Sequence, residues 1–198
     1  MNLNWVHIVL YETPEGKSVG LTQSLAMDAI ITVGSDSKPI IELLKDMDII
    51  HIQDITNRNN FLRNIRIFVN GAPQGYTHNP HEIVKELRTM RRNGSIDSEI
   101  SISLDLISEE IRIFTDNGRI CRGVIILNEG QFLLNESILD NIEGHKSLYG
   151  ECNKWINLLK NGYVEMLCKD EEEYLNVAVL PSDLEKINKN DRKNIYTL

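Results

Sequence analysis

The dipeptide Asn70-Gly71 constrains the fold of this chain more than any other pair of residues. It follows "IRIFV" (65–69), whose β-branched and aromatic side chains are typical of a strand. The tight turn that joins two antiparallel strands needs positive φ at both central residues, which Asn and Gly tolerate best. The sequence therefore predicts a β-hairpin here, with "APQGYT" (72–77) as the returning stretch.

A helix is predicted directly after this hairpin, over residues 80–92. Asn79 is a favoured N-cap residue, and Pro80 suits the first helical position because its missing N–H would have no partner there. Glu82 lies where it complements the helix dipole, and Gly94 can end the helix. The apolar side chains recur at helical spacing, and they are Ile83, Val84, Leu87 and Met90.

Further strands and a second turn complete this region. "EISISLDL" (99–106) alternates apolar and polar residues, which predicts a half-buried strand. "EIRIFT" (110–115) and "RICRGVIIL" (119–127) flank Asp116-Asn117-Gly118, which predicts a second hairpin. Residues 61–123 are thus predicted to form one compact α+β unit, and the whole chain is predicted to be α+β, built from small domains with antiparallel hairpins and short helices.

An ordered turn stands near the beginning of the chain, in "YETPEGKSVGL" (11–21). Pro14 fixes its own φ near −65°, while Gly16 and Gly20 can adopt positive φ. The sequence predicts a rigid turn that carries the carboxylates of Glu12 and Glu15.

A helix is predicted next in "PIIELLKDM" (39–47), with Ser37 or Asp36 as its cap. The polar run "TNRNN" (56–60) breaks the pattern, so a domain boundary is expected there.

The last third of the chain begins in an apolar strand, "GVIIL" (123–127). A helix is predicted in "CNKWINLLKNG" (152–162), ended by its glycine. "YVEMLCKDEEEYLNVAVL" (163–180) is interpreted as two strands around a solvated acidic turn at Asp170–Glu173. Residues 185–198 form a charged tail.

Charge and cysteine usage exclude several classes of protein. The formal charge of −8 and the isoelectric point of about 5.2 argue against a free-standing protein that binds nucleic acid or membranes. No apolar run approaches the roughly 20 residues of a membrane span, and no signal peptide is recognised at the start. Cys121, Cys152 and Cys168 are odd in number and far apart, so reduced, mostly buried thiols of an intracellular protein are expected.

Candidate sites are few. His78 and His81, beside Glu82, have the look of a metal pair, but a helix begins between them, so solvated residues at the helix start are the preferred interpretation. The basic residues of the predicted helix could bind nucleic acid, although a solvated face with favourable C-terminal charges is preferred; they are Lys85, Arg88, Arg91 and Arg92.

Arg119 and Arg122 have two open interpretations, because each could bind a partner's carboxylate or form an internal ion pair. The sequence contains no nucleophile with a neighbouring base and no carboxylate cluster with metal spacing. No catalytic, cofactor-binding or metal-binding residue is therefore predicted.

Several stretches resemble, in order, segments of one known family. "YETPEGKSVGLTQSLAM" (11–27) resembles the Glu-Thr-Pro-Glu-Gly segment that ends the fork region in the second-largest subunit of multisubunit DNA-directed RNA polymerase. The other resembling stretches include "ITVGSDSKPII" (31–41), as in eukaryotic, archaeal and large-DNA-virus forms, and "IFVNGAPQGYTHNPHEIVKELRTMRRNGSIDSEISI" (67–102), "EIRIFTDNGRICRG" (110–123) and "LLKNGYVEMLCKDEEEYLNVAVLPSDL" (158–184). The resemblance covers about Trp5 to Leu184, although Val9-Leu10 replaces a Cys-Pro common in the family.

The resemblance implies a domain organisation and a role. Residues 1–60 would be the C-terminal part of the fork, 61–123 the first external domain, 124–184 the second, and 185–198 a tail that leads to the wall and hybrid-binding domain. The chain would then be a non-catalytic central segment, without the family's catalytic part, from a split or interrupted gene or a shortened chain. The alternative is a free-standing interaction module derived from the external domains, without transcription activity.

The resemblance also implies partners and cofactors. The partners would be other polymerase subunits and the remaining parts of the same subunit, with template DNA and RNA bound only within the complex and no membrane. Mg²⁺ and Zn²⁺ would belong to other parts of the assembled enzyme, and no cofactor to this segment. The location would be the nucleus, a cytoplasmic viral factory or a virion, without secretion.

The resemblance assigns the early turn to the neighbourhood of the active centre, beside the downstream edge of the RNA–DNA hybrid. Its residues are Glu12, Thr13, Pro14, Glu15 and Gly16. The two carboxylates would anchor arginines of neighbouring segments by charge-assisted hydrogen bonds. Alternatively, they only complete local backbone hydrogen bonds.

Overall fold

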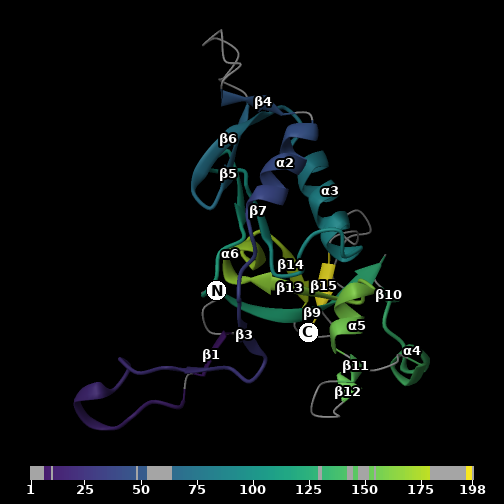
Figure 1. The fold of residues 1–198 in the computed structure, drawn as a ribbon. Coiled ribbons are helices and arrows are strands. Elements are labelled where there is room, and N and C mark those ends of the chain that lie inside the picture. Colours follow the sequence, from purple (N-terminus) through teal and green to yellow (C-terminus); the bar gives the residue numbers. More distant parts are fainter. Residues whose placement is uncertain are drawn as a thin grey trace.

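The structure, a computed structural model, describes residues 7–9, 11–47, 49–52, 64–128, 131–141, 145–146, 152–153, 155–178 and 195–197. Two sheets form the body, and an extended N-terminal segment projects from it (Figure 1). Helices accompany the strands of both sheets, so the predicted α+β class is confirmed.

The first sheet has five strands in the order β4-β6-β5-β8-β7. Only β5 and β8 run parallel to each other. The strands are β4 (Ile50–His51), β5 (Ile65–Val69), β6 (Ala72–Thr77), β7 (Ser101–Asp105) and β8 (Glu110–Phe114). The hairpin between β5 and β6 is confirmed, since Asn70 and Gly71 have φ of 48° and 78°.

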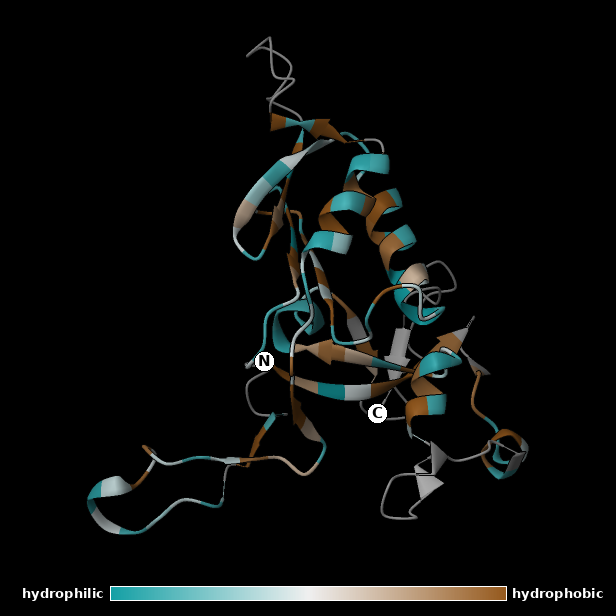
Figure 2. Cartoon of the chain, viewed as in Figure 1, coloured by the Kyte–Doolittle hydropathy of each residue, from teal (hydrophilic) through white to brown (hydrophobic). Residues whose placement is uncertain are grey.

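Two helices, α2 (Lys38–Asp46) and α3 (Pro80–Arg92), pack on this sheet (Figure 1). The bounds predicted for α3 are confirmed. Of the two predicted cap residues, Asp36 contacts the start of α2: its Oδ1 accepts a hydrogen bond of 3.1 Å from the backbone N–H of Lys38. Both helices show brown and teal stretches in Figure 2, and their buried apolar residues belong to a core shared with the sheet. That core contains Ile40, Leu44, Ile67, Val69, Ile83, Val84, Leu87, Ile100, Ile102, Ile111 and Ile113.

The second sheet is built around the long strand β9 (Ile120–Asn128). Its other strands are β3 (Ala29–Ile31), β10 (Gln131–Phe132), β13 (Val164–Cys168), β14 (Asn176–Ala178) and β15 (Ile195–Thr197). Helix α5 (Trp155–Lys160) packs on it and is followed by Gly162 at φ 67°, as predicted. A Cβ atom at Gly123 would overlap the Trp155 ring, so glycine allows this ring to lie across β9.

The remaining described elements are short. They are β1 (Ile8–Val9), the 3₁₀ helix η1 (Gly16–Ser18), β2 (Ser24–Leu25), α4 (Glu136–Asn141), β11 (His145–Lys146), β12 (Cys152–Asn153) and α6 (Lys169–Glu172). Among the residues that the structure describes, no helix is both long and apolar enough to cross a membrane. The polar run at 56–60 lies outside the described residues, as does most of the predicted tail, apart from 195–197 in β15.

The second predicted hairpin is wrong. Strands β8 and β9 flank the turn at Asp116-Asn117-Gly118, but they belong to different sheets and do not pair. Strand β8 lies between β5 and β7, so both of its edges are already occupied. The turn connects the two sheets instead. The hairpin partner of β8 is β7. Strand β7 ends before the predicted residue 106, because Leu106 and Ile107 lie exposed in the turn between the two strands.

Candidate functional site

Residues 11–33, called here the arm, carry the predicted turn away from the body (Figure 1). The side chain of Thr13 closes the turn: its Oγ1 accepts a hydrogen bond of 2.9 Å from the Gly20 N–H and lies 3.5 Å from the Thr22 carbonyl oxygen. Gly16 and Gly20 have φ of 86° and 74°, so the predicted left-handed glycines are confirmed. The turn is therefore ordered by local chemistry alone.

The structure brings the five predicted site residues together at this turn, and all of them are exposed. Within the described part of the chain, neither carboxylate, of Glu12 or of Glu15, takes part in a hydrogen bond or ion pair. The arrangement can present two negative charges to another molecule. Its role near an active centre stays a prediction.

The base of the arm is fixed to the body by backbone hydrogen bonds. Thr32 donates its N–H to the Arg119 carbonyl at 2.9 Å and accepts from the Gly118 N–H at 2.9 Å. The carboxylate of Glu99 then accepts from the N–H groups of Val33 at 2.8 Å and Gly34 at 3.1 Å. The turn predicted as a hairpin is thus the surface on which the arm is anchored.

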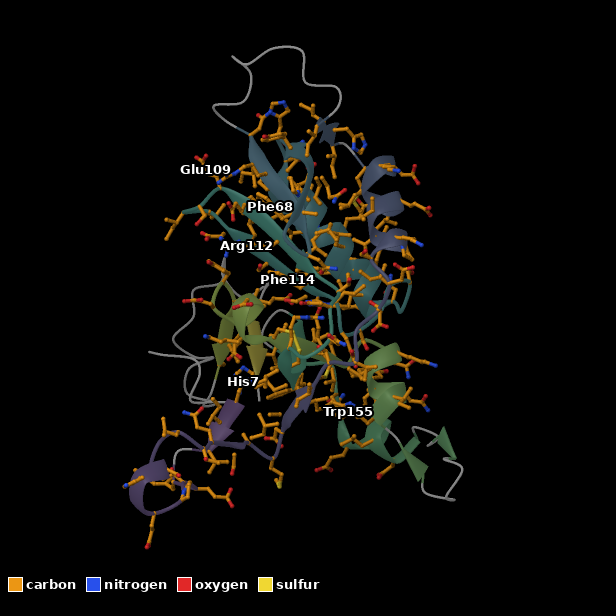
Figure 3. All side chains as sticks on the ribbon, turned by 60° about the vertical axis from the view of Figure 1, so that its left-hand side comes forward. His7, Phe68, Glu109, Arg112, Phe114 and Trp155 are labelled. Atoms are coloured by element: carbon orange, nitrogen blue, oxygen red, sulfur yellow. A yellow bond between two sulfur atoms is a disulfide. The ribbon has the colours of Figure 1, made fainter. Side chains whose placement is uncertain are left out.

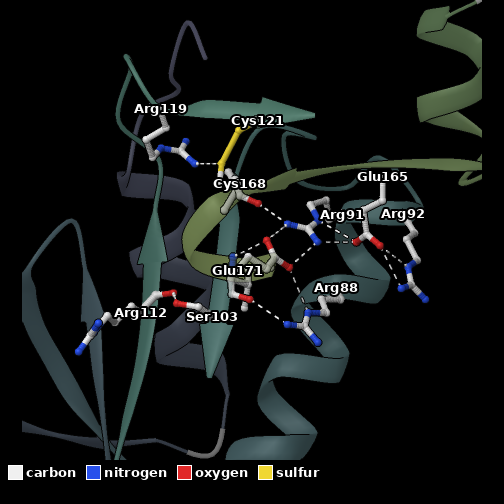
Figure 4. Close-up of polar contacts among 12 residues, drawn as sticks. Arg88, Arg91, Arg92, Ser103, Arg112, Arg119, Cys121, Glu165, Cys168 and Glu171 are labelled. Carbon is white, nitrogen blue, oxygen red and sulfur yellow. Dashed lines mark hydrogen bonds and ion pairs between the residues drawn. A yellow bond between two sulfur atoms is a disulfide. The ribbon is translucent and has the colours of Figure 1, made fainter. Parts of the chain in front are cut away.

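A buried charge cluster joins the two sheets (Figure 4). Arg91 of α3 lies 2.5 Å from Glu165 of β13 and 2.8 Å from Glu171 of α6, and all three side chains are almost fully buried. Arg92 binds the second oxygen of Glu165 at 3.0 Å. Since each carboxylate accepts from guanidinium groups in fixed geometry, these bonds orient α3 against β13 and α6.

The same cluster binds the backbone of β7. Glu171 accepts a hydrogen bond of 3.1 Å from the Ile102 N–H, and Arg88 donates to the Ile102 carbonyl at 3.0 Å. Arg91 donates to the Ile100 carbonyl at 2.6 Å. Two arginines and one glutamate therefore satisfy two backbone groups of β7, both at Ile102, and one group just before the strand, at Ile100.

Two predictions about these charges are wrong. The helix face with Arg88 and Arg91 is not solvated. The acidic turn is solvated only in part, since Glu171 and Glu172 are buried while Asp170 and Glu173 are exposed. The physical reason is the folding of the acidic turn into α6, which packs against β7 and faces the helix. Opposite charges far apart in sequence neutralise each other there.

The two ambiguous arginines both form internal ion pairs. Arg122 of β9 binds Glu172, whose other neighbour is the buried His7 at 3.5 Å. Arg119 lies 2.8 Å from Asp116 and also donates to the Glu99 carbonyl at 2.9 Å. His7 lies next to β1, at the start of the N-terminal segment, and is labelled in Figure 3. Because His7 contacts Glu172, the pair Arg122–Glu172 connects this segment to β9 and α6.

The remaining candidates do not converge on a site. His78 and His81 are exposed at the start of α3. Among the described residues, no group of three or more His, Cys, Asp or Glu side chains could hold a metal ion. The expectation of reduced thiols is wrong for Cys121 and Cys168, which form a disulfide because they lie directly opposite each other on β9 and β13. Both are buried, as expected.

The buried carboxylates predict how stability depends on pH. Burial alone would raise the pKa of Glu165, but the charges of Arg91 and Arg92 outweigh it and lower this pKa. Burial opposes ionisation of Glu172 in the same way, and hydrogen bonds from His7 and Arg122 lower its pKa too. A carboxyl with a lowered pKa in the folded state binds fewer protons than in the unfolded state, so stability is lost as pH falls.

We therefore expect the melting temperature to be constant from about pH 7 to pH 5 and to fall below about pH 4.5, where unfolded glutamates take up protons. Thermal unfolding followed by circular dichroism between pH 3 and pH 8 measures this. In the variant Glu165→Gln the fall should be shallower, because one of the titrating groups is gone. A melting temperature that stays level down to pH 3 would contradict the assignment.

Two models of one protein family match different parts of the chain. The family model described as RNA polymerase Rpb2, domain 4, matches residues 67–128, and the one described as RNA polymerase Rpb2, domain 5, matches residues 155–197. The first match contains α3 and the turn that anchors the arm, and the second contains β13 and α6. The buried charge cluster therefore joins two segments that are recognised separately.

Individual relatives match nearly the whole chain. Identity is 32% to DNA-directed RNA polymerase II subunit RPB2 of Schizosaccharomyces pombe, over 93% of this chain and 16% of that protein. It is also 32% to the RPB2 subunit of Encephalitozoon cuniculi, over 99% of this chain and 17% of that protein. It is 29% to DNA-directed RNA polymerase subunit Rpo2 of Saccharolobus shibatae, over 91% and 16%.

The chain spans about a sixth of the length of these relatives. Within that share the similarity includes the arm, the anchoring turn and both sheets, in the same order as in the relatives. The predicted resemblance is confirmed: this chain belongs to the family of second-largest subunits of multisubunit DNA-directed RNA polymerases.

Proposed function

We propose that this chain is a non-catalytic central segment of the second-largest subunit and supports transcription within an assembled DNA-directed RNA polymerase. The observation that carries the proposal is the continuous similarity over more than nine-tenths of the chain to proteins about six times longer. The proposed parts are the end of the fork (1–60), the first external domain (61–123), the second (124–184) and a tail (185–198).

The proposal extends to partners. The chain would bind the other parts of the same subunit and further polymerase subunits, and it would meet template DNA and RNA only in the complex, inside the cell or a virion. Mg²⁺ and Zn²⁺ would be held by other parts of the enzyme. The net charge of −8 supports the proposal that the chain meets DNA and RNA only in the complex, because an acidic chain gains little from phosphate contacts by itself.

The test combines this chain with the polypeptide of the same genome that carries the remaining second-largest subunit sequence, together with the other subunits. Template-directed RNA synthesis by the mixture, absent when this chain is left out, would support the proposal. Equal RNA synthesis without this chain would instead favour a free-standing interaction module. The isolated chain should be inactive in both cases.

We further propose that Glu12 and Glu15 anchor arginines of a neighbouring segment near the active centre. Both carboxylates are exposed, and the side-chain hydrogen bond that closes the turn comes from Thr13 and not from either of them, which leaves them available to another molecule. This local satisfaction counts against the alternative in which they only complete backbone hydrogen bonds.

The variants Glu12→Ala and Glu15→Ala should change the elongation rate or nucleotide selection of the assembled enzyme, measured by single-nucleotide addition on a defined RNA–DNA scaffold. Assembly should be intact, and the free energy of unfolding of the chain should change by less than about 1 kcal/mol, as for other exposed substitutions. The exposed Glu42→Ala on α2 is the matched control. If the turn variants transcribe like the parent, the turn is only architecture.

A further inference from the structure

We propose that Cys121 and Cys168 form a reversible thiol–disulfide switch, in which Arg119 stabilises the Cys168 thiolate and the sulfur bond controls how firmly α6 is held between the two sheets. The co-reactant is a dithiol or a low-molecular-weight thiol, and the reaction is thiol–disulfide exchange. The switch is a property of the chain itself, so it stands or falls independently of the proposed function.

The disulfide lies across two strands that also pair through their backbones. Cys121 of β9 and Cys168 of β13 are opposite each other in the antiparallel ladder, and four further residue pairs continue the same register. Because these pairs do not depend on the sulfur bond, the strands should stay in register when the bond is reduced. The oxidised and reduced chains can therefore share one fold, as a reversible switch requires.

A guanidinium group next to the disulfide favours its reduction. Nη1 of Arg119 donates a hydrogen bond of 3.0 Å to Sγ of Cys168 (Figure 4). A disulfide sulfur is uncharged and a weak acceptor, so it gains little from a neighbouring positive charge. A thiolate at the same position gains a charge-assisted hydrogen bond, and positive neighbours of this kind stabilise reactive cysteine thiolates. The contact marks Cys168 as the sulfur that carries the negative charge after reduction.

Other contacts hold Arg119 in place beside the sulfur. Its Nε lies 2.8 Å from the Asp116 carboxylate, and its Nη2 donates to the Glu99 carbonyl at 2.9 Å and to the Asp116 carbonyl at 3.0 Å. None of these acceptors changes its charge in the exchange reaction. The guanidinium group is therefore already positioned when the thiolate forms.

The exchange transfers two electrons from the reductant to the disulfide. A thiolate of the reductant attacks Sγ of Cys121 and forms a mixed disulfide, while the bond to Cys168 breaks and leaves its electron pair on Sγ of Cys168, beside Arg119. A second thiolate of the reductant then attacks the reductant's own sulfur in the mixed disulfide and releases Cys121, which takes a proton from water. The products are two reduced cysteines and the disulfide of the reductant.

Helix α5 controls access to the pair, because both sulfur atoms are buried. Cys121 and Cys168 form a cluster with Met166, and Trp155 and Leu159 of α5 pack against it. Exchange therefore requires local opening of α5. The same packing supplies a probe: a nearby disulfide quenches indole emission, so reduction should increase the fluorescence of Trp155.

The sulfur bond acts on α6, because Cys168 directly precedes this helix. Within α6, Glu171 accepts a hydrogen bond of 3.1 Å from the Ile102 N–H, and Glu172 binds Arg122. The disulfide ties the start of α6 covalently to β9, so its reduction should let α6 open more often. The Ile102 N–H loses its acceptor in each opening and therefore reports the position of α6.

The test equilibrates the purified full chain with mixtures of reduced and oxidised glutathione that span the poise of reducing and oxidising compartments. Trp155 emission, together with the mass of the chain after alkylation, measures the fraction of disulfide. We expect that fraction to change within this range and to recover when the mixture is reversed. A disulfide that stays complete at the reducing end, or never forms at the oxidising end, would overturn the switch. Cys152→Ser should titrate like the parent, because the third cysteine lies outside the pair.

Substitutions of Arg119 test its role at the sulfur. Arg119→Gln should shift the equilibrium about tenfold towards the disulfide, the effect of losing one hydrogen bond to a charged group, and Arg119→Lys should recover most of this shift because it keeps the charge. Asp116→Asn is the matched control, since it removes the ion pair of Arg119 and leaves the sulfur contact; it should shift the equilibrium less than about threefold. If Arg119→Gln titrates like the parent, or the control shifts as far, Arg119 has no role at the sulfur.

Hydrogen exchange of the wild-type chain, followed by nuclear magnetic resonance, tests the control of α6 without any substitution. The Ile102 N–H should exchange at least about tenfold faster in the reduced chain than in the oxidised chain, because α6 opens more often. The Leu44 N–H within α2 should change less than about threefold. Equal exchange at Ile102 in both states would show that the sulfur bond does not control α6.

Discussion

The variant Arg91→Ala is expected to lower the free energy of unfolding by about 3–5 kcal/mol, the range for breaking a buried ion pair by removing one partner. Arg91 is 3% exposed and binds Glu165 and Glu171 together with the Ile100 carbonyl. Its removal leaves two buried carboxylates short of their main counter-charge. Urea unfolding followed by tryptophan fluorescence measures the loss.

The control for this variant lies on the same helix. Lys85 is exposed on α3, so Lys85→Ala should change the free energy of unfolding by no more than about 0.5 kcal/mol. Arg91→Lys should recover only part of the loss, because an ammonium group cannot reproduce the forked contacts with both glutamates. A loss below about 1 kcal/mol for Arg91→Ala would show that the cluster is not held as described.

Gly34→Ala should be the second most damaging single change, at about 2–4 kcal/mol. Gly34 has φ of 87°, and a Cβ atom there would lie 2.8 Å from the Asn117 backbone nitrogen. The substitution combines left-handed strain with a backbone collision at the base of the arm. Thermal unfolding measures its cost, and limited proteolysis should show faster cleavage within residues 11–33.

Gly94→Ala separates the two contributions. Gly94 has a similar φ of 71°, but nothing lies within 4 Å of the position of its Cβ atom. Only the conformational cost of about 1–2 kcal/mol should appear there, without a change in cleavage of the arm. If both alanine variants lose the same stability and show the same cleavage of the arm, the close approach of residue 34 to the turn does not contribute to stability.

Local chemistry made part of this fold predictable. The hairpin at Asn70-Gly71 and helix α3 follow from turn residues, caps and periodicity that lie within a few positions of each other in sequence. The glycine conformations of the arm were predictable for the same reason. The destination of the turn at Asp116–Gly118 was not, because strand pairing depends on which edges are already occupied by distant segments.

The buried charges show a signal that sequence reasoning overlooked. Arg91 follows Leu87 by four positions and Ile83 by eight, so it lies on the buried stripe of α3 and not on the solvated face. Its position could have predicted burial. No local pattern identifies Glu165 and Glu171 as its partners, since these lie 74 and 80 residues away. The exposure of the arm could not be predicted from local sequence either, because it depends on which other segments of the chain pack on the arm.

The contacts around Ile102 have a consequence for aggregation. Strand β7 is the last strand of its sheet, and an open strand edge invites pairing with a second molecule. Here side chains of Arg88, Arg91 and Glu171 occupy the outward backbone groups at Ile100 and Ile102, in place of a neighbouring strand. Residues from α3 and α6 thus cover the edge at the start of β7. A shortened chain that ends before α6 would lose the glutamate and leave this edge free, so solubility of the first sheet depends on a segment that is not part of it.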